Sequence, residues 1–167
     1  MSARRAFISL GLALSIAACA QPANPPAAAA PAVDSAAVTA AIADLWSRWI
    51  SADTAGNTAA LVEMVADSAR LDVRGMPPML GRAAWKTMVE AGYKTTKYTS
   101  MTIVPDKTIP ISNEMAYQNG SYTEGSTTQG KSYMDYGRYA SALRKDPDGQ
   151  WRIAYIMVFS DSMPVKK

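Results

Sequence analysis

Apolar residues recur at helical spacing in three segments of the N-terminal half of the chain. The spacing predicts an amphipathic helix over residues 36–53, a shorter one over 57–66 with Asn57 as N-cap, and a third over 82–92 that ends at Gly92. Each of these helices has one apolar face to bury. The apolar stripe of the first helix consists of Val38, Ile42, Leu45 and Trp49.

Between the second and third helices the pattern changes to strict alternation. Ala69, Leu71 and Val73 alternate with charged residues, which predicts a short strand that the sequence "GMPP" ends. The second half of the chain is rich in Thr, Tyr, Ile and Val, and "DPDG" is typical of a tight turn. Helices that precede strands indicate an α+β domain whose last four strands form an antiparallel meander. These strands are predicted over 95–105, 112–124, 131–145 and 150–160.

Composition narrows the classes of function. An apolar content of 49% over 167 residues is enough for one domain with a substantial core. The chain has no His and a single Cys, so the commonest general base, an internal disulfide and a Cys-based zinc site are all excluded. No metal or cofactor is expected. Without Arg4 and Arg5, 15 basic residues stand against 14 acidic ones, so no nucleic-acid partner is expected either.

The N-terminus has the pattern of an export signal. "MSARR" is positively charged, and residues 6–18 form an apolar run that is too short to span a bilayer. The residues before Cys19, "IAA", resemble the lipobox of bacterial lipoproteins. We therefore expect a signal peptide over 1–18 and a lipid on Cys19, and an ordinary secretory signal with an incidental Cys is the alternative. "RRAF" resembles the core of a twin-arginine signal, so the export route stays open.

The segment that follows Cys19 is almost uncharged and contains four prolines over residues 20–37. This composition predicts a loose tether over 19–35, ahead of a folded domain over 36–163. Ala20 after the lipidated Cys implies transfer to the outer membrane. We therefore expect a protein that reaches the membrane through its lipid anchor, with its domain facing the periplasm.

The order of these elements resembles the nuclear transport factor 2-like superfamily, which includes SnoaL-like proteins and ketosteroid isomerases. The resemblance is carried by "AGNTAALVEMVADSARLDVRG" (55–75), "LGRAAW" (80–85) and "DGQWRIAYIMVFS" (148–160), and covers about residues 36–163. It implies a cone-shaped fold in which three N-terminal helices pack on a curved antiparallel sheet around a cavity. Family members use this cavity for catalysis or binding, or use the fold to dimerise, so the fold does not determine the function.

The resemblance also implies where isomerase chemistry would lie. Ketosteroid isomerases use a Tyr on the first helix, an Asp base on the first strand and a protonated Asp on a later strand. These positions fall on Trp49, on Val73 and near Ser141. Asp72 is one residue early, which on a strand points its side chain to the other face. Steroid-isomerase activity is therefore not expected, and no catalytic residue is assigned from these positions.

Alternation extends the predicted pocket. If Val73 and Ser141 face inward, so do Asp135 and Tyr139. Tyr117 and Asn119 of the neighbouring strand are also expected to face inward. Asp44, Asp53 and Glu63 are expected to form no carboxylate pair arranged for acid–base chemistry. Alternatively, the tyrosines are core residues and Asp135 is a solvated partner of Arg138 or Lys131. The predicted pocket consists of Trp49, Val73, Tyr117, Asn119, Asp135 and Tyr139.

Three functions remain open from the sequence. The first is a lipid-anchored domain that binds a small apolar or amphipathic molecule in its cavity. The second is a dimeric accessory module, or a purely structural partner of an envelope complex that uses the outer face of its sheet. The third is a SnoaL-like enzyme of the isomerase, cyclase or lyase type, with Asp135 as base and Tyr139 as hydrogen-bond donor.

Overall fold

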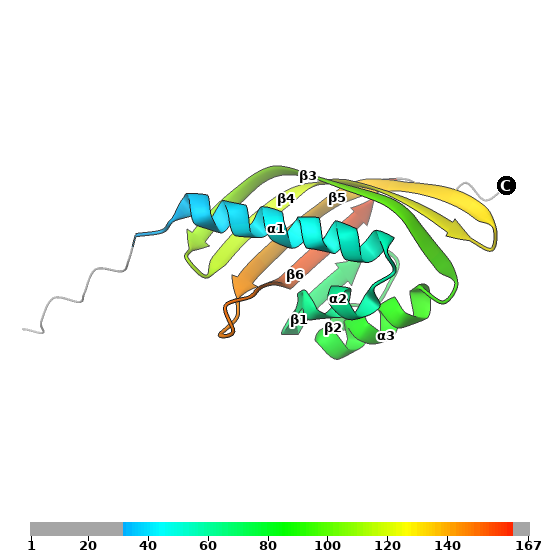
Figure 1. Cartoon of the computed structure of the whole chain (residues 1–167), viewed down its shortest axis with the longest axis horizontal. Coiled ribbons are helices and arrows are strands. Elements are labelled where there is room, and N and C mark those ends of the chain that lie inside the picture. The colour runs from blue at the N-terminus through cyan, green and yellow to red at the C-terminus, as the bar shows by residue number, and fades with distance from the viewer. Residues whose placement is uncertain (1–31, 162–167) are drawn as a thin grey trace, which may run out of the picture. The chain divides into compact units, whose positions relative to one another are not determined.

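The computed structural model describes residues 32–161 (Figure 1). The predicted signal peptide and Cys19 lie outside the described residues, as does most of the predicted tether. Three helices and six strands follow one another along the described part of the chain. They are α1 (Ser35–Thr54), α2 (Thr58–Glu63), β1 (Val65–Val73), β2 (Met79–Leu80), α3 (Arg82–Gly92), β3 (Thr96–Ser112), β4 (Met115–Thr128), β5 (Lys131–Lys145) and β6 (Trp151–Ser160).

The strands form one sheet in the order β2-β1-β6-β5-β4-β3. The predicted antiparallel meander is confirmed, because each strand from β3 to β6 pairs with the next. β1 joins the sheet parallel to β6, and β2 pairs antiparallel with β1. The α+β class is therefore confirmed, with one parallel strand pair that the sequence pattern did not reveal.

Several element boundaries differ from the prediction, and the strand predicted over 112–124 is β4, Met115–Thr128. The second helix ends at Glu63 rather than at residue 66, because Val65 and Ala66 are fully buried and Val65 pairs with Ile153 of β6. Pairing in the sheet thus overrides local helix propensity. β3 extends to Ser112, seven residues beyond the prediction, since its prolines lie on an edge strand where β-bulges accommodate them.

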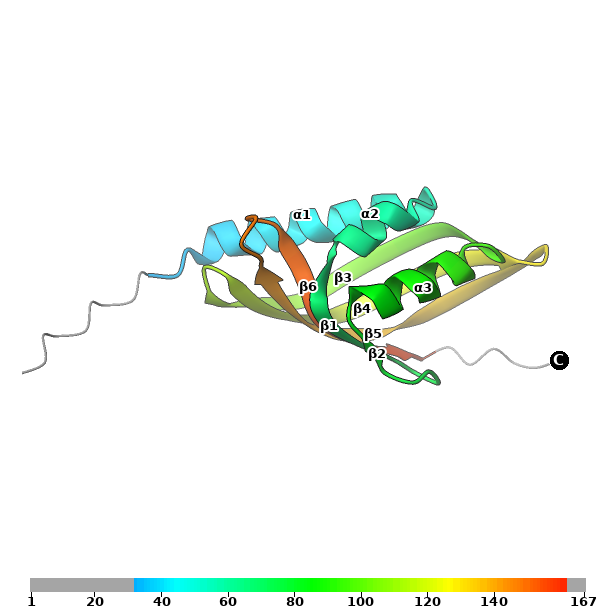
Figure 2. The same ribbon diagram turned by 90° about the horizontal axis from the view of Figure 1, so that it is seen from below.

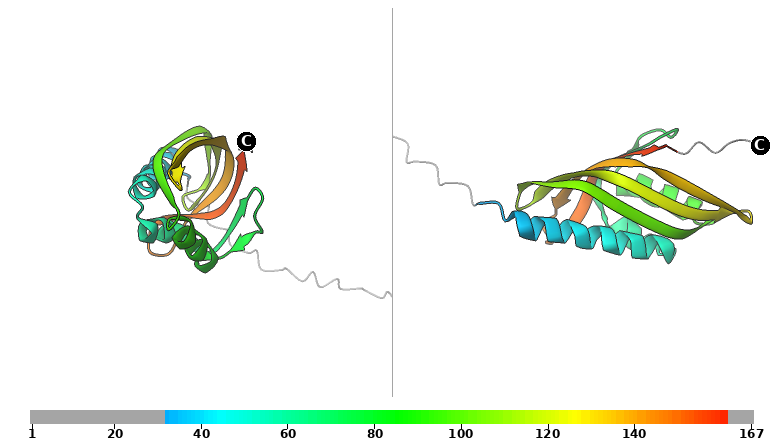
Figure 3. Two further views of the ribbon diagram at one scale, coloured as in Figure 1. Left: turned by 90° about the vertical axis from the view of Figure 1, so that its right-hand side faces the viewer. Right: turned by 90° about the horizontal axis from the view of Figure 1, so that it is seen from above.

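The sheet is strongly curved, and two glycines permit this curvature. A Cβ atom at Gly137 would lie 1.9 Å from the carbonyl oxygen of Phe159, and one at Gly120 would lie 2.3 Å from that of Val104. Figures 2 and 3 show the sheet curling into a cup, with α1 and α3 along its open side. The cup has an interior that side chains from the helices and the concave face share.

The interior is densely packed around the first half of α1. Val38, Ile42 and Leu45 are at most 3% exposed and belong to the same core as Leu143 and Ile153 of the sheet. Asp34 caps the helix, because its side chain accepts a hydrogen bond from the backbone N–H of Ala37. Within residues 32–161, no helix combines the length and apolarity needed to cross a bilayer.

Candidate ligand-binding cavity

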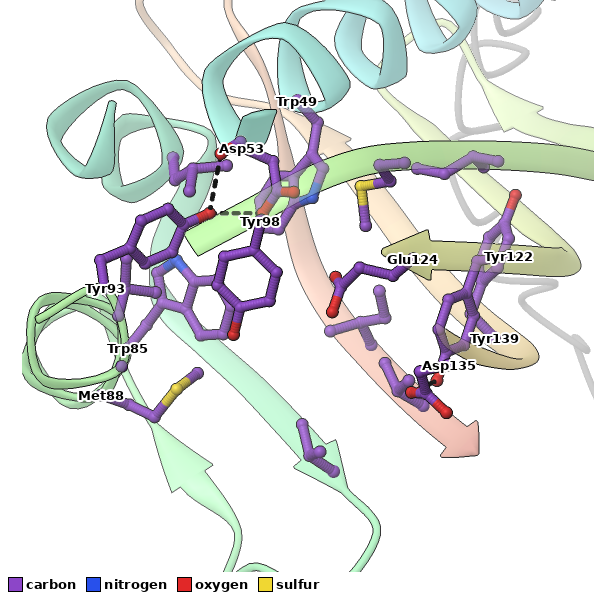
Figure 4. A pocket seen from close by; sticks show the side chains of 18 of the residues that line it. Trp49, Asp53, Trp85, Met88, Tyr93, Tyr98, Tyr122, Glu124, Asp135 and Tyr139 are labelled. Atoms are coloured by element: carbon purple, nitrogen blue, oxygen red, sulfur yellow. Dashed lines mark hydrogen bonds between the residues drawn. The ribbon is translucent and has the colours of Figure 1, made fainter. Parts of the chain in front are cut away.

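The second half of α1 is also buried, but its Trp46, Trp49 and Asp53 line a cavity of about 290 Å³ (Figure 4). α3 and the concave face of the sheet enclose the remaining sides. The lining is mainly aromatic and apolar, with a few acidic groups. Its aromatic members are Trp46, Trp49, Trp85, Tyr93, Tyr98, Tyr122 and Tyr139, and its acidic members are Asp53, Glu124 and Asp135.

The aromatic rings are held by contacts with one another. Trp49 of α1 stacks on Trp85 of α3, with ring centroids 5.6 Å apart and planes inclined by 28°. Trp46 meets the ring of Tyr139 edge to face at 5.5 Å. Such pairs fix ring orientation as well as burying apolar area. The wall of the cavity is therefore preorganised rather than collapsed.

Asp53 lies at the end of α1, where it is 6% exposed. The hydroxyl of Tyr93 donates a hydrogen bond to Oδ1 of Asp53 and a longer one, of 3.3 Å, to its backbone carbonyl. Oδ2 of Asp53 has no hydrogen-bond partner among the described residues. Burial raises the pKa of Asp53, and the hydrogen bond from Tyr93 opposes this rise.

Glu124 of β4 lies directly opposite Asp135 of β5 in the sheet. Burial is the largest cause that raises the pKa of Glu124, followed by the negative charges of Asp53 and Asp135, and together they raise it to about 8. No hydrogen bond to the Glu124 carboxylate is among the causes that set this pKa. Burial and the charge of Glu124 likewise raise the pKa of Tyr98 to about 12.

The third acidic group of the lining, Asp135, is hydrogen-bonded to neighbouring hydroxyl groups. Tyr122 donates to Oδ2 of Asp135 at 2.9 Å, and the hydroxyl of Ser160 hydrogen-bonds Oδ1. Tyr139 donates instead to Oε1 of Gln118 at 2.8 Å. Asp135 and Tyr139, the predicted base and hydrogen-bond donor, thus both line the cavity, and each is hydrogen-bonded to other residues.

Gln118 separates the cavity from the packed interior. It is 1% exposed, and its Oε1 accepts hydrogen bonds from Nε1 of Trp46 and from Tyr139. Its Nε2 donates to Oγ1 of Thr108 at 2.7 Å. Every polar atom of this side chain therefore has a partner, which orients two of the aromatic rings that line the cavity.

Four of the predicted pocket residues lie in the lining, namely Trp49, Val73, Asp135 and Tyr139. The inward orientation predicted for Tyr117 and Asn119 is wrong. Tyr117 is 37% exposed, whereas its neighbours Ala116 and Gln118 are buried. The register of β4 is one residue out of step with the prediction, so that Gln118, Tyr122 and Glu124 face inward instead.

The positions that resemble the isomerase site carry no acid or base in the cavity. Val73 and Trp49 line it, whereas Asp72 faces the opposite side of the sheet, where it binds Arg70 and Tyr155. The Arg70 guanidinium keeps the pKa of Asp72 low. Ser141 is fully buried, and its hydroxyl donates to the carbonyl of Gln118.

Several cavity residues were not predicted. Asp53 was predicted to lie on a helix and to form no carboxylate pair for acid–base chemistry, and the structure places it in the cavity lining with Glu124 and Asp135. Glu124, Tyr93 and Tyr98 were not singled out at all. Among residues 32–161, no group of three or more His, Cys, Asp or Glu side chains is arranged to hold a metal ion.

Comparison with known proteins agrees with this geometry. Residues 34–156 match the family model of the SnoaL-like domain, and the chain belongs to this family. No curated protein matches the sequence significantly. The match spans the helices and nearly all of the sheet, so the family assignment covers every element that lines the cavity.

Solved structures show the same fold at low sequence identity. A ketosteroid isomerase-like protein from Erwinia carotovora atroseptica aligns with a TM-score of 0.66 and 17% identity, over 74% of this chain and 96% of the other. A conserved protein from Planctomyces limnophilus aligns with a TM-score of 0.67 and 19% identity, over 75% and 98%. A hexachlorocyclohexane dehydrochlorinase (LinA) Type2 aligns with a TM-score of 0.64 and 15% identity, over 76% and 87%. At such identities, these similarities establish the fold alone.

Proposed function

We propose that this domain binds a small, mostly apolar molecule in its cavity. The observation that carries the proposal is a cavity of about 290 Å³, walled by seven aromatic side chains and lined by only a few polar groups. Small-molecule sites have this composition, because apolar walls supply affinity and a few polar groups supply orientation. Family membership is consistent with such a role, since the fold encloses a cavity.

Binding can be tested with neutral aromatic probes and a variant that fills the cavity. Val158 lines the cavity from β6, whereas Met157 is not part of the lining. We expect tert-butylbenzene to bind the full-length protein saturably in calorimetry, Val158→Phe to abolish binding and Met157→Phe to retain it. Absence of saturable binding, or unchanged binding to Val158→Phe, would contradict the proposal. A dimer that binds no probe would instead support the accessory-module function.

Acid–base catalysis is a second candidate, and Glu124 is the observation that favours it. A carboxyl with a pKa of about 8 in a cavity can exchange a proton near neutral pH. Glu124 therefore replaces Asp135 as the preferred base. If a substrate is found, Glu124→Gln should lower kcat at least 100-fold with KM nearly unchanged, whereas Glu114→Gln should have no effect. Full turnover by Glu124→Gln would exclude this role, and full turnover by Asp135→Asn would exclude the pair predicted from the sequence.

We also propose that the domain is anchored by a lipid on Cys19 at the outer membrane, facing the periplasm. The charged N-terminus, the apolar run and the residues before Cys19 support this proposal. Metabolic labelling with a fatty acid should label the wild-type protein and not Cys19→Ser. Release of Cys19→Ser from the membrane fraction is the accompanying expectation. Labelling that survives the substitution would contradict the proposal.

A further inference from the structure

We propose that the ligand of this cavity is an organic cation, whose positively charged nitrogen lies beside Asp53 and Glu124 and whose apolar part fills the aromatic remainder. This inference rests on the proposed binding function and specifies the chemical class of the ligand. Three features of the cavity carry it: its charge, an unpartnered buried acceptor, and the aromatic faces around both.

The charge of the cavity has one sign. Three carboxyl groups line it, from α1, β4 and β5, whereas no Lys, Arg or His side chain does. Elsewhere in the described chain, carboxylates that are comparably enclosed have basic partners, as Asp146 has in Arg152. Asp53 and Glu124 have no basic partner among the described residues of the lining, so in their ionised form they repel anions and attract cations, and the low-dielectric walls of the cavity strengthen this preference.

One of these carboxyl groups has a buried oxygen with nothing to bind. Oδ2 of Asp53 has no hydrogen-bond partner among the described residues, and the residue is 94% buried, since 6% of it is exposed. A buried acceptor without a donor costs about 1–3 kcal/mol, and a positive charge held beside this carboxyl would offset that cost. Figure 4 shows this carboxyl on the cavity side of α1, with the Glu124 carboxyl also directed into the cavity.

Aromatic faces surround the same space. Trp49, Trp85, Tyr93 and Tyr98 lie on the Asp53 side of the cavity (Figure 4). The face of an aromatic ring attracts a cation, and this attraction grows when the cation is removed from water. An organic cation matches this set better than a metal ion, for which the described carboxyls are not grouped.

The experiment compares two probes of nearly identical shape, phenyltrimethylammonium and neutral tert-butylbenzene. At pH 9 we expect the cation to bind the full-length protein about tenfold more tightly in calorimetry. At pH 6 this preference should fall, because Glu124 becomes protonated while the quaternary nitrogen keeps its charge. The titratable groups that face Glu124 across the cavity are Asp53 from α1, Tyr93 after α3, Tyr98 from β3, Tyr122 from β4, and Asp135 and Tyr139 from β5.

Variants separate charge from shape. Glu124→Gln should reduce cation affinity about tenfold at pH 9 and leave the affinity for tert-butylbenzene unchanged. Asp53→Asn should act in the same direction, whereas Asp44→Asn, on the exposed side of α1, should change neither. Unchanged binding of the neutral probe also shows that each variant is folded.

The outcomes distinguish this inference from the binding function beneath it. Tighter binding of the cation that depends on Glu124 supports the inference. If tert-butylbenzene binds and the cation binds equally or more weakly, the ligand class is wrong while the cavity remains a binding site. If neither probe binds, the binding function itself fails, and the inference falls with it.

Discussion

The two halves of α1 face two different interiors. Val38, Ile42 and Leu45 in the first half are almost completely buried against the sheet. One and two turns later, Trp49 and Asp53 line a cavity instead. The same helix and the same strands therefore build a packed core at one end and line a cavity at the other. Because protein interiors are normally close-packed, we interpret the cavity as a feature of the fold.

Carboxylates differ between the two ends in the same way. Beside the β5–β6 turn, Asp146 and Asp148 bind the buried guanidinium of Arg152. Among the described residues that line the cavity, no basic side chain pairs with Asp53 or Glu124. Removing one partner of a buried ion pair leaves an unpaired buried charge, which costs stability, and the cavity carboxylates carry a cost of this kind when they are ionised. Carboxylate pairing therefore distinguishes the packed end of the domain from the cavity end.

The largest expected effect on the free energy of unfolding comes from replacing an isoleucine by alanine at the packed end and at the cavity end of the domain. Ile42→Ala should lower the free energy of unfolding by about 2–5 kcal/mol, because it leaves a void in a filled core. Ile103→Ala should cost less than half as much, since Ile103 is partly buried and already borders the cavity. Urea denaturation of both variants measures this difference. Equal costs would mean that the cavity end is packed like the core.

The next effect is a pH dependence located at the cavity end. The folded-state pKa of Glu124, about 8, lies above its usual 4.5, so the folded protein binds more protons between these values. Stability from this group is complete below pH 4.5 and is lost as pH rises through 8. Glu124→Gln should therefore raise stability at pH 9 by a few kcal/mol relative to wild type and flatten the profile. Denaturation at pH 5, 7 and 9 measures it, and an identical slope in both proteins would contradict it.

A smaller effect is expected at the boundary between the two ends. Gln118→Met keeps the side-chain volume but removes the acceptor that Trp46 and Tyr139 share. We expect a loss of about 1–3 kcal/mol in thermal or urea unfolding, because two buried donors lose their partner. Tyr139→Phe, which removes one of these donors, is the matched control and should cost less. A neutral Gln118→Met would show that the boundary does not depend on this network.

The smallest expected effect is the loss of stability when the pair between Asp148 and Arg152 is broken. Arg152 lowers the pKa of Asp148 to about 2, below its usual 3.8. The stability that this pair contributes is present above pH 3.8 and is lost as pH falls through 2. Asp148→Asn should therefore destabilise the protein at pH 7 and have little effect near pH 2. Asp44→Asn, which breaks an exposed pair with Arg48, is the control, and a larger loss from that variant would reverse the expected order.

Periodicity was sufficient to predict the fold class and every element except the two-residue strand β2. The apolar stripe of α1 and the alternation in β1 both reflect which residues are buried. The spacing of apolar residues along the sequence therefore predicts these elements. The extent of β3 and the parallel pairing of β1 with β6 depend on contacts between distant segments. No local pattern contains those contacts, so these features could not be predicted in the same way.

The orientation of β4 could have been predicted from its turn. Gln129 and Gly130 both have positive φ and form a two-residue hairpin loop that places Thr128 opposite Lys131. Counting back from this pair sets Glu124 opposite Asp135, which shows that Glu124 and not Asn119 faces inward. Asp53 follows Trp49 by four residues and so continues the apolar stripe of α1, which was the sign that this acidic residue points inward.

Tyr93 and Tyr98 had no such sign. Tyr93 follows the last turn of α3, and Tyr98 lies beside an irregularity in the pairing of β3 with β4. Tyr93 is oriented by its hydrogen bond to Asp53, and Tyr98 contacts the ring of Tyr93, so both orientations depend on tertiary contacts. Residues placed in this way can be assigned to a site only once the fold is known.

The central claim is that the cavity end of the domain holds an acidic group with no basic partner. The most direct test is an NMR titration of the Glu124 side-chain carboxyl in the ligand-free full-length protein, assigned by comparison with Glu124→Gln. Burial and the neighbouring carboxylates predict a midpoint near pH 8. A midpoint near its usual 4.5 would show that the carboxyl is solvated or paired, and would contradict the account of the cavity.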